Sequence, residues 1–204
     1  EFEKALSLFH QYGTKPYWLA FYAELGIAYH KTGQYKKEKK LYRQAERDFP
    51  NDPDLLDQQA WLELTLGNEK EAKIYLDKWL ALRREQSWTE AHISSYLAYI
   101  YSMAERYDKV EEYYRKALAL EPGNITRQNN FAYFLIDKNR NTDEGLAMAV
   151  KALASDPENY YSMHITGYAL YKKGAYRQAL EWMEKSWALR MKKSIYQHRS
   201  FLQL

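Results

Sequence analysis

The sequence contains no cysteine among its 204 residues, which excludes disulfide bonds and thiolate chemistry within the chain. It also lacks any uncharged apolar run of about 18 residues, so we expect no membrane insertion by this segment. Neither sign of charge dominates, because 30 Lys and Arg stand against 27 Asp and Glu. The net charge of +3 is too small to indicate binding of nucleic acid.

Patterns typical of enzymes are missing as well. The sequence has no Gly-rich phosphate loop and no G-x-S-x-G motif. Its five histidines fall in no metal-binding spacing such as H-E-x-x-H, so we predict no metal site, no cofactor and no enzymatic activity. His164 is better suited to hydrogen bonding than to general base catalysis.

What the sequence does have is aromatic residues, 16% of the total, arranged in a repeating order. A small residue recurs at intervals of 34, 38, 34 and 35 positions, at Gly26, Ala60, Ala98, Ala132 and Gly167. A second series follows at intervals of 34, 38, 35 and 34 positions, at Ala45, Trp79, Ala117, Ala152 and Ser186. An interval longer than 34 indicates inserted residues. Comparing the two series places four of them in 83–90 and one in 138–141, where we expect loops.

This order, with a period near 34, resembles the tetratricopeptide repeat family along nearly the whole chain. The resemblance implies an all-α fold, a right-handed α-α superhelical solenoid of helix-turn-helix repeats forming a single domain, 1–204. We predict five repeats, at 19–52, 53–86, 91–124, 125–159 and 160–193. Residues 1–14 are interpreted as the second helix of a partial repeat, and residues 194–204 as the start of a capping helix. Because the chain begins inside a helical pattern, we expect it to be part of a longer protein.

Local signals support two helices in each repeat. Gly33, Gly67 and Gly174 fit the left-handed turn that ends a first helix. Asp52 and Pro53 are suited to the N-cap and first position of the next helix. Some positions depart from the family pattern, since Glu38 and Val110 replace small residues of second helices, Trp79 replaces another small residue, and Arg84 stands where proline is usual.

The resemblance also implies a ligand groove lined by the first helix of each repeat. The ninth position of each repeat is expected to face this groove, and four of the five residues there are aromatic: Trp61, Tyr99, Tyr133 and Tyr168. The fifth position adds a polar row, which contains Asp57, Ser95, Asn129 and His164. Such a surface suits an extended peptide, because rings supply contact area and polar groups can bind its backbone.

Three alternatives remain open, and a fourth lacks support. The aromatic residues could instead pack between repeats, or could stack on a sugar or another small ligand. The apolar residues Phe2, Leu6 and Phe9 could mediate self-assembly, with homo-oligomers formed through the end helices. A clamp for a C-terminal carboxylate lacks support, because Asn130 occupies an Asn slot but the required basic residues are missing.

The sequence therefore predicts a non-enzymatic scaffold that binds a protein or an extended peptide. The segments 129–133 and 167–171 resemble bacterial members of the family. Cytoplasmic, periplasmic and membrane-anchored locations are all open, and the sequence does not identify the partner.

Overall fold

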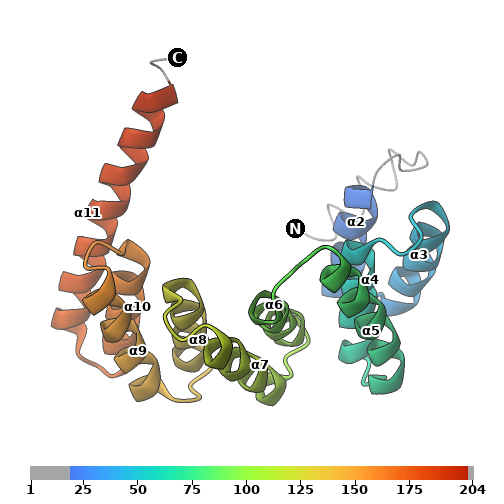
Figure 1. Ribbon diagram of the computed structural model, residues 1–204, viewed down its shortest axis with the longest axis horizontal. Helices are drawn as coiled ribbons and strands as arrows, with labels where there is room; N and C mark the ends of the chain where they lie inside the picture. The colour runs from blue at the N-terminus through green and yellow to red at the C-terminus, as the bar shows by residue number, and fades with distance from the viewer. Residues whose placement is uncertain (1–18, 202–204) are drawn as a thin grey trace. The chain divides into compact units, whose positions relative to one another are not determined.

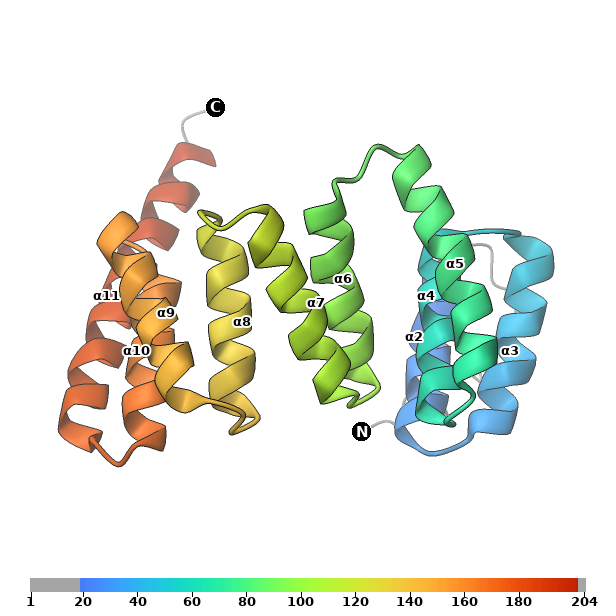
Figure 2. The ribbon, with the colours of Figure 1, turned by 60° about the horizontal axis from the view of Figure 1, so that its bottom comes forward.

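The computed structural model describes residues 19–201, with side chains described up to residue 193. The described chain is helical, and the helices follow one another as antiparallel pairs (Figures 1 and 2). This confirms the all-α fold class expected from the repeats. The predicted partial repeat at 1–14, including Phe2, Leu6 and Phe9, lies outside the described residues.

The chain divides into two compact units, one ending at Tyr113 and the other beginning at Tyr114, so that the boundary falls within α7. From residue 19 onward, the first unit contains five whole helices: α2 (Leu19–Lys31), α3 (Tyr35–Asp48), α4 (Pro53–Thr65), α5 (Glu69–Glu85) and α6 (Glu90–Met103). Helix α7 (Tyr107–Leu120) contributes to both units. The second unit continues with α8 (Ile125–Asp137), α9 (Thr142–Ser155), α10 (Tyr160–Lys172) and α11 (Tyr176–Phe201).

The turns inside the helix pairs use left-handed backbone, as the glycines predicted. Gly33, Gly67 and Gly174 have φ angles of 70°, 79° and 80°. The other two pairs place non-glycine residues in this region, with φ values of 57° for Glu105 and 51° for Asn139. Asn139 lies in the predicted one-residue insertion, and an Asn side chain tolerates this conformation better than most.

Short polar side chains cap the starts of α4, α6 and α8. The Asp52 side chain accepts hydrogen bonds from the backbone N–H groups of Asp54 and Leu55, with Pro53 in the first turn, as predicted. Thr89 and Asn124 cap α6 and α8 in the same way. Each cap satisfies backbone donors that lack a partner within the helix.

Small residues allow the helices of a pair to cross closely. Ala60, Ala98 and Ala132 are fully buried at these crossings. At Gly26, a Cβ atom would lie 2.5 Å from Cζ of Tyr42 in α3, and closer still to its hydroxyl. The repeating small residue is therefore explained by helix packing, which leaves no room for a side chain at Gly26.

The four-residue insertion lengthens α5 and forms an aromatic cluster in the first unit. Helix α5 continues to Glu85, and Ser87 then adopts a φ angle of 62°. The Trp88 ring packs edge-on against the fully buried Trp79 ring at 5.8 Å. The Arg83 guanidinium lies over the Trp88 ring at 4.5 Å. Trp79 thus replaces a small residue where the inserted segment supplies aromatic packing partners.

The last helix differs from the prediction. We expected a new helix to begin near residue 194, but α11 runs without a break from Tyr176 to Phe201. No glycine or proline occurs between Gly174 and residue 201, so nothing in the sequence interrupts the helix. None of the helices in the described range has the length and apolar character needed to cross a membrane.

Candidate functional site

The second unit presents a line of stacked rings on α8 and α10. Tyr133 of α8 lies against Tyr168 of α10 with ring centroids 5.7 Å apart and planes 24° from parallel. Along α10, Tyr168 faces His164 at 6.5 Å, and His164 faces Tyr161 at 6.4 Å. The spacing 161, 164, 168 places all three residues on one side of the helix. We call Tyr161, His164, Tyr168 and Tyr133 the aromatic ladder.

The aromatic ladder is accessible to solvent. Tyr133 and Tyr161 each expose 37% of their surface, His164 is exposed and Tyr168 is half-buried. A line of exposed rings is unusual beside a core in which Phe131, Leu135 and Ile165 are fully buried. Tyr168 thus connects the ladder to the core of the second unit, and the other three rings offer an exposed contact surface.

Charged groups surround the middle of the aromatic ladder. The Tyr168 hydroxyl donates a 3.0 Å hydrogen bond to Oδ1 of Asp137, and Nζ of Lys172 lies 5.5 Å from the Tyr168 ring centroid. Hydrogen bonding from Lys138, with help from Tyr168, lowers the pKa of the Asp137 carboxyl. The carboxylate thus stays charged at neutral pH and orients the Tyr168 ring.

The other predicted residues of the aromatic row lie in the first unit. Tyr99 is half exposed, at 50%, and its ring is 5.6 Å from that of Tyr96. Trp61 is only 3% exposed and stacks on His30 at 3.7 Å. Packing between helices, the alternative interpretation of the aromatic row, therefore describes Trp61, whereas Tyr99 presents an open ring.

Two residues of the predicted polar row are buried in contacts between first helices, a correction to the expected open row. Asp57 of α4 accepts a 2.6 Å hydrogen bond from the Tyr96 hydroxyl of α6. Asn129 of α8 exchanges two hydrogen bonds with the Ser162 hydroxyl of α10, at 2.8 and 3.0 Å. Burial of these polar groups requires such partners, so both residues hold neighbouring helices together.

Ser95 and His164 complete the polar row. The half-buried Ser95 hydroxyl donates to the Ala91 carbonyl at 3.0 Å within its own helix. His164 is exposed within the aromatic ladder. Of the eight predicted residues, the structure thus brings Tyr133, His164 and Tyr168 together on one exposed surface. Tyr161 was missed, although its position three residues before His164 placed it on the same helix face.

Comparison with known proteins agrees with the repeat pattern. Residues 19–47 and 91–124 each match a family model described as tetratricopeptide repeat. Both segments therefore contain tetratricopeptide repeats, and repeats of this kind are found in protein-interaction scaffolds. No curated protein matches the sequence.

Solved structures include helical proteins of similar length. The crystal structure of MamA has a TM-score of 0.50 and 17% identity, over 84% of this tetratricopeptide repeat chain and 97% of that protein, which supports the shared fold. A MamA fragment from Desulfovibrio magneticus RS-1 has a TM-score of 0.47 and 20% identity, over 85% and 95% of the two chains. YrrB, titled a TPR protein with an unusual peptide-binding site, has a TM-score of 0.49 and 16% identity, over 98% and 97%.

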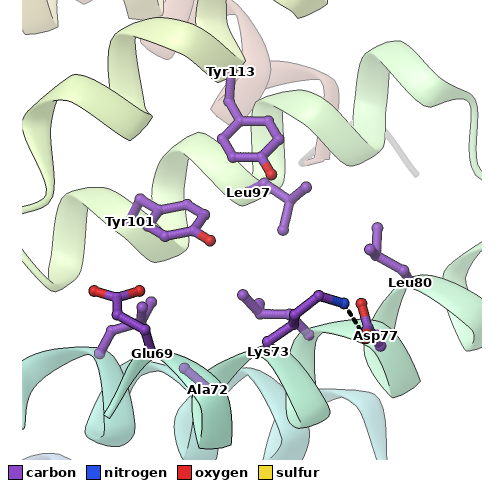
Figure 3. Close-up of a pocket in the computed structure, with 10 residues that line it drawn as sticks. Glu69, Ala72, Lys73, Asp77, Leu80, Leu97, Tyr101 and Tyr113 are labelled. Carbon is purple, nitrogen blue, oxygen red and sulfur yellow. Dashed lines mark hydrogen bonds and ion pairs between the residues drawn. The ribbon is translucent and has the colours of Figure 1, made fainter. Parts of the chain in front are cut away.

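A separate hollow of about 320 Å³ lies between neighbouring tetratricopeptide repeats of the first unit (Figure 3). Tyr101 and Tyr113 line one side, and their rings stack at 5.4 Å. The opposite side belongs to α5, where Lys73 donates a 2.5 Å hydrogen bond to Asp77. Burial raises the pKa of Tyr101 to about 12, so its hydroxyl remains protonated. This hollow has an apolar floor and a charged rim.

Within the described part of this tetratricopeptide repeat chain, no group of histidine and acidic side chains is arranged to hold a metal ion. The first unit does contain a buried acid and base in contact, because Glu38 is fully buried and its carboxylate lies 3.0 and 3.1 Å from Nδ1 of His30. Glu38 occupies a position where a small residue is usual, and its contact with His30 joins α3 to α2.

Proposed function

We propose that the chain binds an extended peptide segment of a protein partner along the aromatic ladder of the second unit. The observation that carries the proposal is the continuous stacking of Tyr161, His164, Tyr168 and Tyr133 on an exposed surface. Tyr168 packs partly against the core cluster of the unit, whereas Tyr133, Tyr161 and His164 are exposed beside it. Tyr99 is an exposed ring of the first unit, and we propose it as a separate contact residue.

The chemistry of the ladder suits a peptide better than a compact ligand. Tyr and His side chains have few rotatable bonds, so they provide contact area at a low cost in conformational entropy. Ring hydroxyls and the His164 imidazole can form hydrogen bonds with a peptide backbone. Asp137 and Lys172, beside Tyr168, supply one charge of each sign near the middle of the surface. An elongated surface with these groups fits a chain in extended conformation.

The buried residues of the predicted rows have a supporting role in this proposal. Asn129 and Ser162 join α8 to α10 through their paired hydrogen bonds. Because the aromatic ladder spans the same two helices, this contact fixes the position of Tyr133 relative to Tyr168. We therefore assign Asn129 to positioning of the ladder rather than to contact with the peptide.

The proposal is tested by selecting peptides from a random phage-displayed library against the chain and measuring their affinity by fluorescence anisotropy. The test variant is Tyr133→Ala with His164→Ala, which removes two exposed rings from the ladder. The control variant is Tyr171→Ala with Tyr176→Ala. These two residues are 53% and 65% exposed, and their rings are 5.6 Å apart in the same unit.

We expect the ladder variant to weaken binding at least tenfold, because truncation of an interface aromatic residue can cost about 2 kcal/mol. The control variant should bind as the parent does, and circular dichroism should show equal helix content in all three proteins. Equal binding by the ladder variant would place the peptide elsewhere. Failure to select any peptide would remove the basis of the proposal.

A further inference from the structure

A hollow of about 570 Å³ lies at the Tyr161 end of the aromatic ladder, between the start of α10 and the middle of α11. It is lined by Tyr160, Tyr161, His164, Met183, Glu184, Ser186, Trp187 and Arg190. Tyr161 and His164 belong to both the ladder and the hollow, so the two surfaces are continuous. The volume is within the range of sites that bind small ligands or large side chains.

The walls of the hollow are held in place by polar contacts between the two helices. The Ser186 hydroxyl of α11 donates a 2.6 Å hydrogen bond to the backbone carbonyl of Tyr160. Nζ of Lys193 donates to the carbonyl of Glu158 at 2.9 Å and lies 6.0 Å from the Tyr160 ring centroid. The start of α10 is therefore fixed against α11 on both sides of the hollow.

The lining is mainly aromatic and is open to solvent. Trp187 exposes 62% of its surface, Tyr160 38% and Tyr161 37%. Large apolar side chains at such exposure are typical of binding surfaces when they are gathered around one hollow. The size and composition of this lining fit a bulky apolar side chain, such as that of Phe, Trp or Leu.

The charge around the hollow selects among partners that carry such a side chain. Residues 160–193 contain seven Lys or Arg against two Glu, although the whole sequence is nearly balanced. Arg190 lines the hollow together with one carboxylate, that of Glu184, and its guanidinium forms no ion pair within the described residues. An exposed guanidinium at the edge of an apolar hollow favours a carboxylate, which it can bind with two hydrogen bonds.

We propose that this hollow binds a bulky apolar side chain of an acidic peptide, and that Arg190 binds a carboxylate next to this anchor. The inference rests on the proposed function, since the rest of the peptide would lie along the aromatic ladder. From Tyr161 to Tyr168 the helix rises about 10 Å. This length corresponds to about three residues of extended peptide. The peptide residue over Tyr168 thus follows or precedes the anchor by three positions.

The experiment uses peptides selected from the phage library and labelled with fluorescein. Trp187→Ala removes the exposed aromatic wall of the hollow, and Arg190→Glu reverses its charge. Their controls are on the same helix but outside the lining: Leu180→Ala, at a residue 58% exposed, and Lys192→Glu, at another exposed basic residue. All four positions are exposed or half-exposed to solvent, so helix content should remain that of the parent.

We expect the selected peptides to contain a bulky apolar residue with Asp or Glu within two positions. Trp187→Ala and Arg190→Glu should each weaken binding about tenfold or more, and each control less than twofold. The effect of Arg190→Glu should shrink at high salt, because screening weakens exposed charge pairs. Replacing the acidic residue of the peptide by Lys should restore binding to Arg190→Glu and weaken binding to the parent.

The outcomes separate this inference from the function on which it rests. If binding depends on Tyr133 but not on Trp187 or Arg190, the anchor hollow is wrong while the ladder remains the peptide site. If none of these positions affects binding, both proposals fail. Light scattering supplies a further check, since a concentrated parent that dimerises and becomes monomeric with Trp187→Ala would show a second copy in the hollow, which contradicts the peptide anchor.

Discussion

The hydroxyl of Tyr96 donates a 2.6 Å hydrogen bond to Oδ2 of Asp57, joining α6 to α4 across neighbouring repeats of the first unit. Asp57 is 3% exposed, and burial raises its pKa from the ordinary value of 3.8 to about 6, opposed in part by the Tyr96 hydrogen bond. The folded protein therefore holds a carboxyl group that favours its neutral form more than the unfolded chain does.

This pKa predicts a loss of stability as pH rises. Because the folded pKa lies above the unfolded one, the contribution of Asp57 is fully present below about pH 4 and is lost as pH rises through about 6. Asp57→Asn keeps an acceptor for Tyr96 without the charge. We expect its stability to match the parent near pH 4 and to exceed it at pH 7 by up to about 3 kcal/mol. Urea denaturation at both pH values measures this, and a difference independent of pH would contradict it.

Glu38 gives a second prediction, because its carboxylate is fully buried against His30. Burial raises the pKa of Glu38, and the His30 contact opposes that rise. Glu38→Ala would leave the imidazole without its buried partner, so we expect a loss of about 3 kcal/mol in the free energy of unfolding at pH 7. Glu85→Ala, at an exposed position, should change it by less than about 0.5 kcal/mol. Equal effects of the two substitutions would show that the pair does not stabilise the fold.

The reciprocal contact between Asn129 and Ser162 is suited to a double-mutant cycle. Asn129→Ala leaves the buried Ser162 hydroxyl without its cross-helix partner, and we expect a cost of about 2 kcal/mol. The double variant with Ser162→Ala should cost less than the sum of the single variants, by about 1 kcal/mol. Additive costs in chemical denaturation would mean that the two side chains are not coupled.

A fourth prediction concerns the close crossing at Gly26. Tyr42 is 1% exposed, so its ring has no space into which it can move away from an added Cβ. We expect Gly26→Ala to destabilise the chain by about 2 kcal/mol, despite the better helix propensity of alanine. Gly123→Ala is the control, because no atom lies within 4 Å of its Cβ position. A thermal unfolding midpoint for Gly26→Ala at or above that of the control would exclude the predicted clash.

Much of the fold was predictable from the sequence because each repeat packs in the same way, so the same residue types recur at the same positions. The small residue at Ala60, Ala98 and Ala132 recurs because helices must cross at each of these positions. The continuous helix α11 was not predicted, since a family pattern expects a break where the local sequence has no residue that ends a helix. Here the intrinsic helix propensity of the chain decided the outcome.

The site was only partly predictable, for a different physical reason. Counting positions within a repeat identifies the helix face of Trp61 and Tyr133, but it does not give the depth of burial. That depth depends on the neighbours each unit supplies. Trp61 is covered because His30 stacks on it, whereas Tyr133 stacks on Tyr168 and stays 37% exposed. The hollow beside Trp187 was missed because counting positions predicts that the two helices of repeat 160–193 pack together, but not where their side chains leave a gap.

The hydrogen bonds that join first helices also have a mechanical consequence. These contacts fix the axial register of neighbouring first helices. The Tyr96–Asp57 hydrogen bond does so for α4 and α6, and the Asn129–Ser162 pair for α8 and α10. A slip of one helical turn, about 5.4 Å, would separate these buried donors from their acceptors. Under tension, neighbouring repeats of a unit should therefore separate abruptly rather than slide. We therefore expect each unit to resist shear until these hydrogen bonds break, and to deform elastically only by bending of its helices.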